Sequence, residues 1–499
     1  MRKFIPSEIE SGEISIPEIE FDLHSRDEIP KVLIGLQHIY SDTEAREEAF
    51  DILKDIIPEG TDMNNGRPGM FMWRILVLGT LKLNCDWNYD NLKEIADNHG
   101  RIREMLGHLT GDDYVYPLQT LKDNLSLFTP EVLDRVNQVV VTEAHKVVGK
   151  KDGDDLKGKC DSSVTKTDVH FPTDIHLLFD AVRSAIRLIA ILCSALGITE
   201  WRQHHKNIMA IKDMFRTVRN LKRSVSGNEK KKAEKEETIN EAHRKYVEIV
   251  MSFIDKVKET ITKLRLTGYA DEKKLSEIED FVKDAEMLAD QILRRVLGDE
   301  KIPHSEKIFS VFERHTEWIV KGKAGVPQEL GKNVCFVTDQ FGFILHHRIY
   351  ENETDDKIAV QIVEQTQERF PDFNSCSFDK GFYSPENKVK LKGMLAGVIL
   401  PKKGKLSGKE KDEENSEEFR EGRRKHSVVE SSISALKNHG LERCPDHGIE
   451  GFMRYVGLAV LARNIQILGH IIQKKKLRSR KRREKYNSTL EAKKQCAAA

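Results

Sequence analysis

The sequence predicts a mixed α/β protein whose sheet is interrupted by a long all-helical insertion and preceded by a helical N-terminal domain. Short segments with β-compatible residues occur near 155–174 and again from 333 onward. Between them, from 175 to 317, apolar residues recur at helical spacing almost throughout. Because strands resume after this stretch, we interpret it as an insertion into one α/β layer. A length of 499 residues indicates about three domains.

The expected organisation has six segments. They are a weakly structured N-terminus (1–40), a helical domain (41–150), the first part of the α/β domain (151–174), the helical insertion (175–317), the rest of the α/β domain (318–472) and a basic C-terminal tail (473–499).

The helical domain contains two helices joined by a polar turn. Pro68 suits the start of a strongly apolar helix that continues to Leu81, and a second helix covers 92–98. Arg101 and Arg103 follow closely. This pattern fits a helix-turn-helix-like unit that binds DNA, or an ordinary helical hairpin.

The α/β segment alternates strands and helices. The expected elements are a strand or hairpin near 156–164, a hairpin formed by 333–337 and 342–349, a helix at 357–370, a strand at 372–378, a short helix at 386–391, a strand at 394–400, a polar loop at 404–424, a helix at 426–438 that Gly440 ends, and a core helix at 454–472.

Net charge carries no argument for a nucleic acid partner, because 81 Lys and Arg balance 81 Asp and Glu. The distribution is more informative, since nine of the twelve residues from Lys474 to Lys485 are basic. Such a block attracts phosphate, and it is equally compatible with a solvated, disordered tail.

The seven cysteines are scattered singly and form no CxxC pair, which argues against a disulfide framework and a classical zinc site. The first 20 residues lack the apolar core of a signal peptide, and 455–472 is too polar to be expected in a bilayer. We therefore expect no membrane association and a reducing, cytoplasmic setting.

Three isolated acids are candidates for metal-assisted phosphodiester chemistry, which commonly uses two divalent cations held by carboxylates. Asp161 lies in the first strand, Asp379 follows a later strand, and Glu430 lies in a helix among small and apolar neighbours. In that helix His426, Glu430 and Lys437 are spaced to share one face. Spacing alone leaves an ordinary surface role open for each acid.

Three sequence motifs in a fixed order favour these three acids over the other acidic residues nearby. Residues 160–174 (CDSSVTKTDVHFPTD), 378–384 (FDKGFYS) and 429–441 (VESSISALKNHGL) resemble the two aspartate motifs and the glutamate helix of DDE transposases of bacterial insertion sequences. Residues 66–70, 318–323 and 329–331 resemble further segments of the same family. The similarity spans most of 45–470, and it is greatest to the ISNCY-like group.

The resemblance implies an RNase H-like catalytic domain in which Asp161, Asp379 and Glu430 hold two Mg²⁺ or Mn²⁺ ions. It also implies binding to terminal inverted repeats and target DNA, assembly as a homodimer or larger homo-oligomer, and a place at the bacterial nucleoid. Expected DNA contacts are Lys380, Arg423, His426 and Lys437. Related groups place Tyr and Arg where this chain has Arg423 and His426, which puts in question how the 5′ phosphate side is held.

Three other acids compete with this set. Asp168 and Asp174 lie near Asp161, and Asp174 resembles a helix cap. Asp339 lies in an expected hairpin tip and is the leading replacement for Asp379. Two other functions also remain open: an inactive or domesticated DNA-binding protein, and a nuclease that cuts DNA without joining it.

Overall fold

The structure is a computed structural model that describes residues 15–57, 69–109, 111–223, 229–320 and 328–498. The chain divides into two compact units, one formed by 1–168 with 319–499 and the other by 169–318. We describe each unit by itself.

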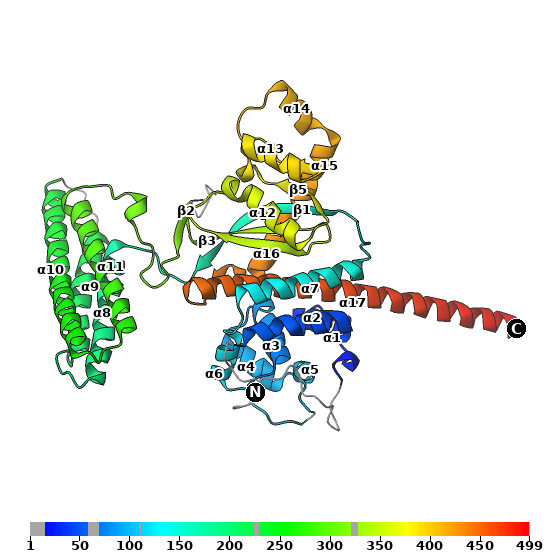
Figure 1. The fold of residues 1–499 in the computed structure, drawn as a ribbon, viewed down its shortest axis with the longest axis horizontal. Coiled ribbons are helices and arrows are strands. Elements are labelled where there is room, and N and C mark those ends of the chain that lie inside the picture. Colours follow the sequence, from blue (N-terminus) through cyan, green and yellow to red (C-terminus); the bar gives the residue numbers. More distant parts are fainter. Residues whose placement is uncertain (1–14, 58–68, 110, 224–228, 321–327, 499) are drawn as a thin grey trace. The chain divides into compact units, whose positions relative to one another are not determined.

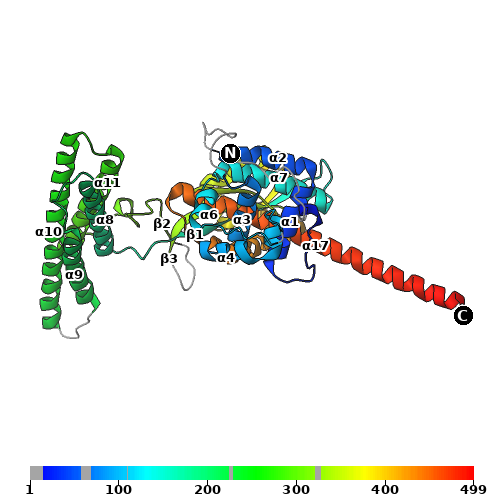
Figure 2. The ribbon, with the colours of Figure 1, turned by 90° about the horizontal axis from the view of Figure 1, so that it is seen from below.

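The first unit contains an N-terminal group of helices and a sheet (Figures 1 and 2). The N-terminal helices are α1 (Glu28–Ser41), α2 (Thr43–Leu53), α3 (Met72–Asn84), α4 (Tyr89–Asn98), α5 (Gly100–Met105), α6 (Leu118–Leu125) and α7 (Pro130–Val148). Two long helices, α7 and the C-terminal α17 (Gly448–Ala498), lie between the other N-terminal helices and the sheet, since both contact strand β4 and each packs against helices of that group.

Residues 28–41 do not belong to a weakly structured N-terminus. They form α1, which Asp27 caps by accepting a hydrogen bond from the Ile29 amide at 2.8 Å. Its buried residues pack on α17, where two glycines allow a very close approach: a Cβ on Gly35 would lie 2.2 Å from the Ile465 carbonyl oxygen, and one on Gly469 would lie 1.7 Å from that of Lys31.

The helical hairpin of the N-terminal group is present, but its expected start is not. The apolar helix α3 begins at Met72, and Pro68 lies outside the described residues. Arg103 donates hydrogen bonds to the backbone carbonyls of Asp97, Asp112 and Tyr114, so it stabilises the fold locally. Arg101 is exposed and pairs with Glu104 at 2.8 Å. DNA binding by this domain therefore stays a prediction.

The sheet has seven strands in the described part of the chain. They are β1 (Leu156–Thr167), β2 (Glu317–Val320), β3 (Gln328–Thr338), β4 (Ile344–Tyr350), β5 (Phe373–Phe378), β6 (Gly397–Ile399) and β7 (Arg443–Cys444). β1 is central: it pairs with β3 antiparallel on one side and, on the other, with β5 and then β7 in parallel. β4 extends the antiparallel side beyond β3, and β6 extends the parallel side beyond β5.

Five further α-helices are described in the first unit: α12 (Asp355–Arg369), α13 (Pro385–Met394), α14 (Gly408–Asn415), α15 (Glu417–His426) and α16 (Val428–Leu436). The expected polar loop at 404–424 is wrong, because α14 and α15 occupy most of it. A capping box between Ser407 and Glu410 starts α14. The expected single helix at 426–438 is divided at Ser427, and Gly440, with φ 94°, ends the helical run as predicted.

The expected basic tail is also helical. α17 continues through Lys474–Lys485, whose side chains are mostly exposed, and this end projects away from the rest of the unit (Figure 1). α17 contains an 18-residue window apolar enough to cross a membrane, and 72% of that window is buried inside the protein. Packing against α1, α3 and α7 accounts for this apolar character.

The described residues of the second unit form a bundle of four long helices with its own core, drawn in Figure 1. Its helices are α8 (Asp174–Ala195), α9 (His204–Arg223), α10 (Glu229–Thr267) and α11 (Glu272–Leu297). Apolar residues of all four fill the interior, as the helical spacing of the sequence predicts.

Candidate active site

The sheet places Asp161 and Asp379 at neighbouring positions. The last described pair between β1 and β5 is Cys160 with Phe378, so Asp161 follows this pair within β1 and Asp379 follows it directly after the end of β5. Asp379 keeps an extended backbone (φ −75°, ψ 164°), which continues the alternation of side chains by one residue. Both aspartates therefore lie on the face opposite Cys160 and Phe378, on strands about 5 Å apart.

Glu430 belongs to a helix that packs on the same strand. α16 contacts β1, and Glu430 lies in its first turn. The preceding helix, α15, packs closely against β6 at Gly422. A Cβ at this position would lie 2.6 Å from the Ile399 side chain, so a glycine permits the approach. The chain thus brings the glutamate helix to the parallel side of the sheet, where Asp379 ends β5.

His426 anchors the end of α15 to the same face of the sheet. Its Nδ1 lies 3.0 Å from the Ser377 hydroxyl, and only 6% of the residue is exposed. Burial, followed by the nearby charge of Arg423, lowers the pKa of His426 to about 4, so the ring is neutral at pH 7. The Ser377 contact and the burial of the ring give His426 a packing role, and its contact with DNA stays a prediction.

The three predicted acids differ in exposure. Asp161 is half-buried, and its Oδ1 accepts a hydrogen bond from the Ser162 amide at 2.7 Å, whereas Asp379 and Glu430 are exposed. Their oxygens do not all lie within 4.8 Å of one another; among the described residues only a different group, described below, meets that criterion. The set of three acids as metal ligands remains a prediction.

Asp339, the leading replacement for Asp379, has a different environment. It is fully buried and accepts hydrogen bonds from the amides of Phe341 and Phe343 at 2.9 and 2.8 Å, while its other oxygen lies 2.7 Å from His145 Nε2. These contacts hold the turn between β3 and β4 and leave the carboxylate closed to solvent. Turn chemistry accounts for this residue.

The two acids near Asp161 in sequence also have partners. Asp168 forms an ion pair with Arg443 at 3.1 Å. Asp174 lies in the first turn of α8, beside the N-cap residue Thr173, and pairs with Arg295 at 2.7 Å. Its predicted role as the cap is thus wrong by one residue, although its acidic side chain suits the positive end of the helix.

A basic hollow adjoins Asp379. It encloses about 430 Å³ and is lined by four cations, one acid and two apolar residues: Lys380, Arg420, Arg423, Arg424, Glu414, Pro401 and Phe419. Arg423 also donates to the Phe378 carbonyl oxygen at 3.3 Å, which ties it to the end of β5. Arg420 and Arg424 are not among the predicted DNA contacts, because the charge-rich composition of 404–424 predicts a loop. On α15 they lie four residues apart, on one helix face.

Lys437 is engaged with an acid. Its Nζ lies 3.1 Å from Glu442, which also pairs with Lys166 of β1. Because α15 ends at His426 and α16 begins at Val428, the expected single face of His426, Glu430 and Lys437 is not formed by one continuous helix.

Comparisons with known proteins support the transposase interpretation. Residues 295–465 match the family model of the transposase DDE domain, a segment that includes Asp379 and Glu430 and begins after Asp161. No curated protein matches the chain, and no solved structure does. The assignment to an ISNCY-like group gains no support from these comparisons. Residues 295–465, about a third of this chain, are therefore similar to the transposase DDE domain.

Proposed function

We propose that this chain cuts and joins the ends of a bacterial insertion sequence. The observation that carries the proposal is that Asp161 of β1 lies beside Asp379, the residue after β5, in a chain whose residues 295–465 match the transposase DDE domain. The strand arrangement supports an RNase H-like catalytic domain. The strands follow one another in the order β4, β3, β1, β5 and β6. The pairs β4–β3 and β3–β1 are antiparallel, and the pairs β1–β5 and β5–β6 are parallel.

The donor set fits hard divalent cations, because Asp161, Asp379 and Glu430 offer only carboxylate oxygens. Two Mg²⁺ or Mn²⁺ ions at these residues would supply polarisation of the phosphate and activation of the attacking oxygen. The exposure of Asp379 and Glu430 leaves their oxygens accessible to DNA and to ions.

The chain's own residues would bind and orient the DNA. Lys380, Arg420, Arg423 and Arg424 give the hollow beside Asp379 a strong positive charge, which suits a DNA phosphate next to the reacting one. Lys437 would supply a further phosphate contact if DNA displaces Glu442. Water attack at the element's end would release a 3′-hydroxyl, which then attacks target DNA at the same acids.

Recognition of the inverted repeats is assigned to the helical domain, with the basic end of α17 at 474–485 as a further contact. Two ends must be paired for joining, so we propose a homodimer or larger homo-oligomer, acting on DNA of the bacterial nucleoid.

The test compares wild type with Asp379→Asn on end DNA in the presence of Mg²⁺. We expect wild type to nick the end and join it to target DNA, and Asp379→Asn to do neither. Asp168→Asn is the matched control, because it removes a nearby acid whose partner is Arg443, and it should remain active. Equal cleavage by wild type and Asp379→Asn would remove Asp379 from the mechanism.

The same assay separates the two alternatives. DNA binding without cleavage by the wild type would indicate an inactive, domesticated protein. Cleavage without joining would indicate a nuclease. Either result would overturn the proposal of strand transfer.

A further inference from the structure

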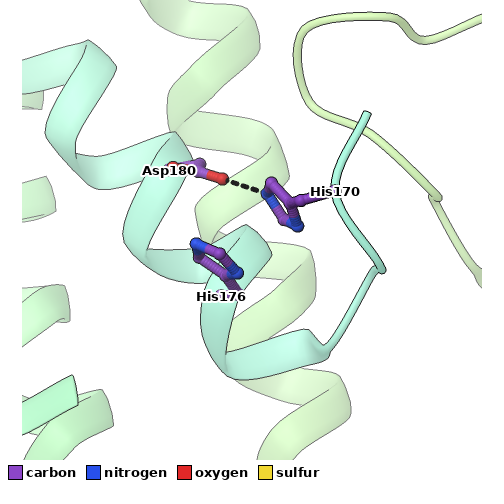
Figure 3. Close-up of side chains that lie close together, drawn as sticks. All are labelled: His170, His176 and Asp180. Carbon is purple, nitrogen blue, oxygen red and sulfur yellow. Dashed lines mark hydrogen bonds and ion pairs between the residues drawn. The ribbon is translucent and has the colours of Figure 1, made fainter. Parts of the chain in front are cut away.

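Two histidines and an aspartate meet at the start of the helical unit, and they include none of the three predicted acids. One ligand atom from each of His170, His176 and Asp180 lies within 4.8 Å of the other two. His176 and Asp180 are four residues apart on α8 and share one face of it, and His170 comes from the segment that leads into this helix (Figure 3).

His170 has more hydrogen-bond acceptors around its ring than a neutral imidazole can serve. Its Nδ1 lies 3.0 Å from the Phe171 carbonyl oxygen and its Nε2 lies 2.6 Å from Asp180 Oδ2. Both neighbours are acceptors, whereas a neutral imidazole has one N–H. A doubly protonated ring would satisfy both contacts, and so would a metal ion bound by Nε2 and the carboxylate after these two groups move apart.

The surroundings match those of a coordinating histidine and carboxylate. Ligating histidines usually donate the other ring N–H to a carbonyl, as His170 can to Phe171. The second oxygen of Asp180 accepts from Arg183 at 2.6 Å, which orients the carboxylate and leaves Oδ2 directed at His170. The structure describes no hydrogen bond to the ring of His176, so that ring retains a nitrogen lone pair for a ligand.

We propose that His170, His176 and Asp180 bind one Zn²⁺ ion, with water in the fourth position. Two imidazoles and one carboxylate are a donor set that zinc takes in proteins. Binding would widen the distance from His170 Nε2 to Asp180 Oδ2 from 2.6 Å to about 3.4 Å, the spacing of two tetrahedral ligands about 2.1 Å from the ion.

One side chain must also turn. The rings of His170 and His176 are stacked, with centroids 3.8 Å apart and an interplanar angle of 20°, so their lone pairs run nearly parallel. Binding would therefore require a rotation of His176 about its Cβ–Cγ bond that directs a ring nitrogen at the ion. The ion would hold the segment before α8 to the first turns of this helix, a role independent of the proposed DNA chemistry.

The test uses the full chain, stripped with a chelator and titrated with Co²⁺ as a coloured substitute for Zn²⁺. We expect the visible absorption of tetrahedral or five-coordinate Co²⁺, lost on addition of one equivalent of Zn²⁺. His176→Gln should lose one bound equivalent. His205→Gln, at an exposed histidine of α9 beside His204, and Asp379→Asn should both retain it.

Each outcome decides the proposal. A wild type without this absorption, or a His176→Gln variant with the same one, would overturn it and leave a proton as the species between His170 and Asp180. If circular dichroism shows that His176→Gln does not fold, His170→Gln takes its place, since His170 is exposed. Retained Co²⁺ binding in Asp379→Asn, which should not cleave DNA, keeps this test separate from that of the transposase activity.

Discussion

Asp339 and Asp379 should respond to substitution in opposite ways. Asp339 is fully buried with three hydrogen-bond partners, whereas Asp379 is exposed at the end of β5. We predict that Asp339→Asn lowers the free energy of unfolding and that Asp379→Asn leaves it nearly unchanged while abolishing DNA cleavage. This pair decides between the two residues as the second catalytic acid.

The magnitudes follow from the contacts. In Asp339→Asn the amide oxygen can still accept from the amides of Phe341 and Phe343, but the charged contact with His145 is lost, at a cost of about 1.5–3 kcal/mol. Asp339→Ala removes every acceptor and should cost about 3–5 kcal/mol. An exposed substitution such as Asp379→Asn should stay within about 0.5 kcal/mol.

The assay is urea unfolding of the full chain followed by far-UV circular dichroism, with cleavage of end DNA measured well below the transition. Far-UV circular dichroism reports both units, so the transition that shifts in Asp339→Ala identifies the first unit. A loss of more than about 1 kcal/mol in Asp379→Asn would show that this acid supports the fold. Unchanged stability in Asp339→Asn, together with loss of cleavage, would assign the catalytic role to Asp339.

Three further predictions concern packing, DNA binding and pH. Gly35→Ala should destabilise the first unit by at least about 1–3 kcal/mol, because its Cβ would lie 2.2 Å from a carbonyl oxygen; Gly393→Ala, in α13 with nothing within 4 Å, should be neutral or slightly stabilising in the same urea unfolding experiment. Replacing Arg420 and Arg424 by Ala should weaken binding to end DNA in a filter or anisotropy assay, and each lost phosphate contact should reduce the salt slope by about one. Burial lowers the pKa of His347 from 6.5 to about 4, so between these pH values the unfolded chain binds more protons than the folded one. The free energy of unfolding should therefore fall as the pH is lowered from 6.5 toward 4, and His347→Gln should reduce this dependence. An unchanged pH dependence in His347→Gln would exclude His347 as its source.

Local patterns in the sequence were sufficient to predict the antiparallel hairpin of the sheet. Alternating and β-branched residues flank a Gly-containing turn near Thr338–Gly342, and β3 and β4 pair there with one register shift between Val337 and Thr338. The amphipathic helix at 357–370 corresponds to α12 (Asp355–Arg369) for the same reason, since a period of 3.6 residues was visible in its apolar positions. Each of these elements depends mainly on its own residues.

The segments predicted wrongly are those whose composition obscured a local signal. Residues 404–424 are so rich in charges that they suggested a loop, although Ser407 and Glu410 form a capping box and Ser416 caps α15. The N-terminal α1 was missed because its amphipathic pattern follows an acidic, weakly patterned stretch. Its stability comes from contact with α17, more than 400 residues later in the chain.

The neighbouring positions of Asp161 and Asp379 could not be obtained from spacing, because they depend on the register between β1 and β5. The motif resemblance suggested that the acids converge, and the structure supplies the reason for the two aspartates: both follow the last paired residues of adjacent parallel strands. The position of Glu430 depends on the packing of α15 and α16, and the expected loop at 404–424 does not predict α15.

The helical unit is inserted in the sequence between β1 and β3, and it does not disturb their pairing because its own two ends lie close together. Phe171 and Trp318 are in ring contact, with centroids 5.5 Å apart, at the beginning and end of the unit. A folded insertion whose ends lie close together connects two strands as a short loop does. The entropic cost of closing a connection also grows only slowly with its length. The register of β1 with β3 and β5 is then set by the strands themselves. The two aspartates can therefore be adjacent although 217 residues separate them in the sequence, and changes within the helical unit that keep its ends together should leave their relative positions intact.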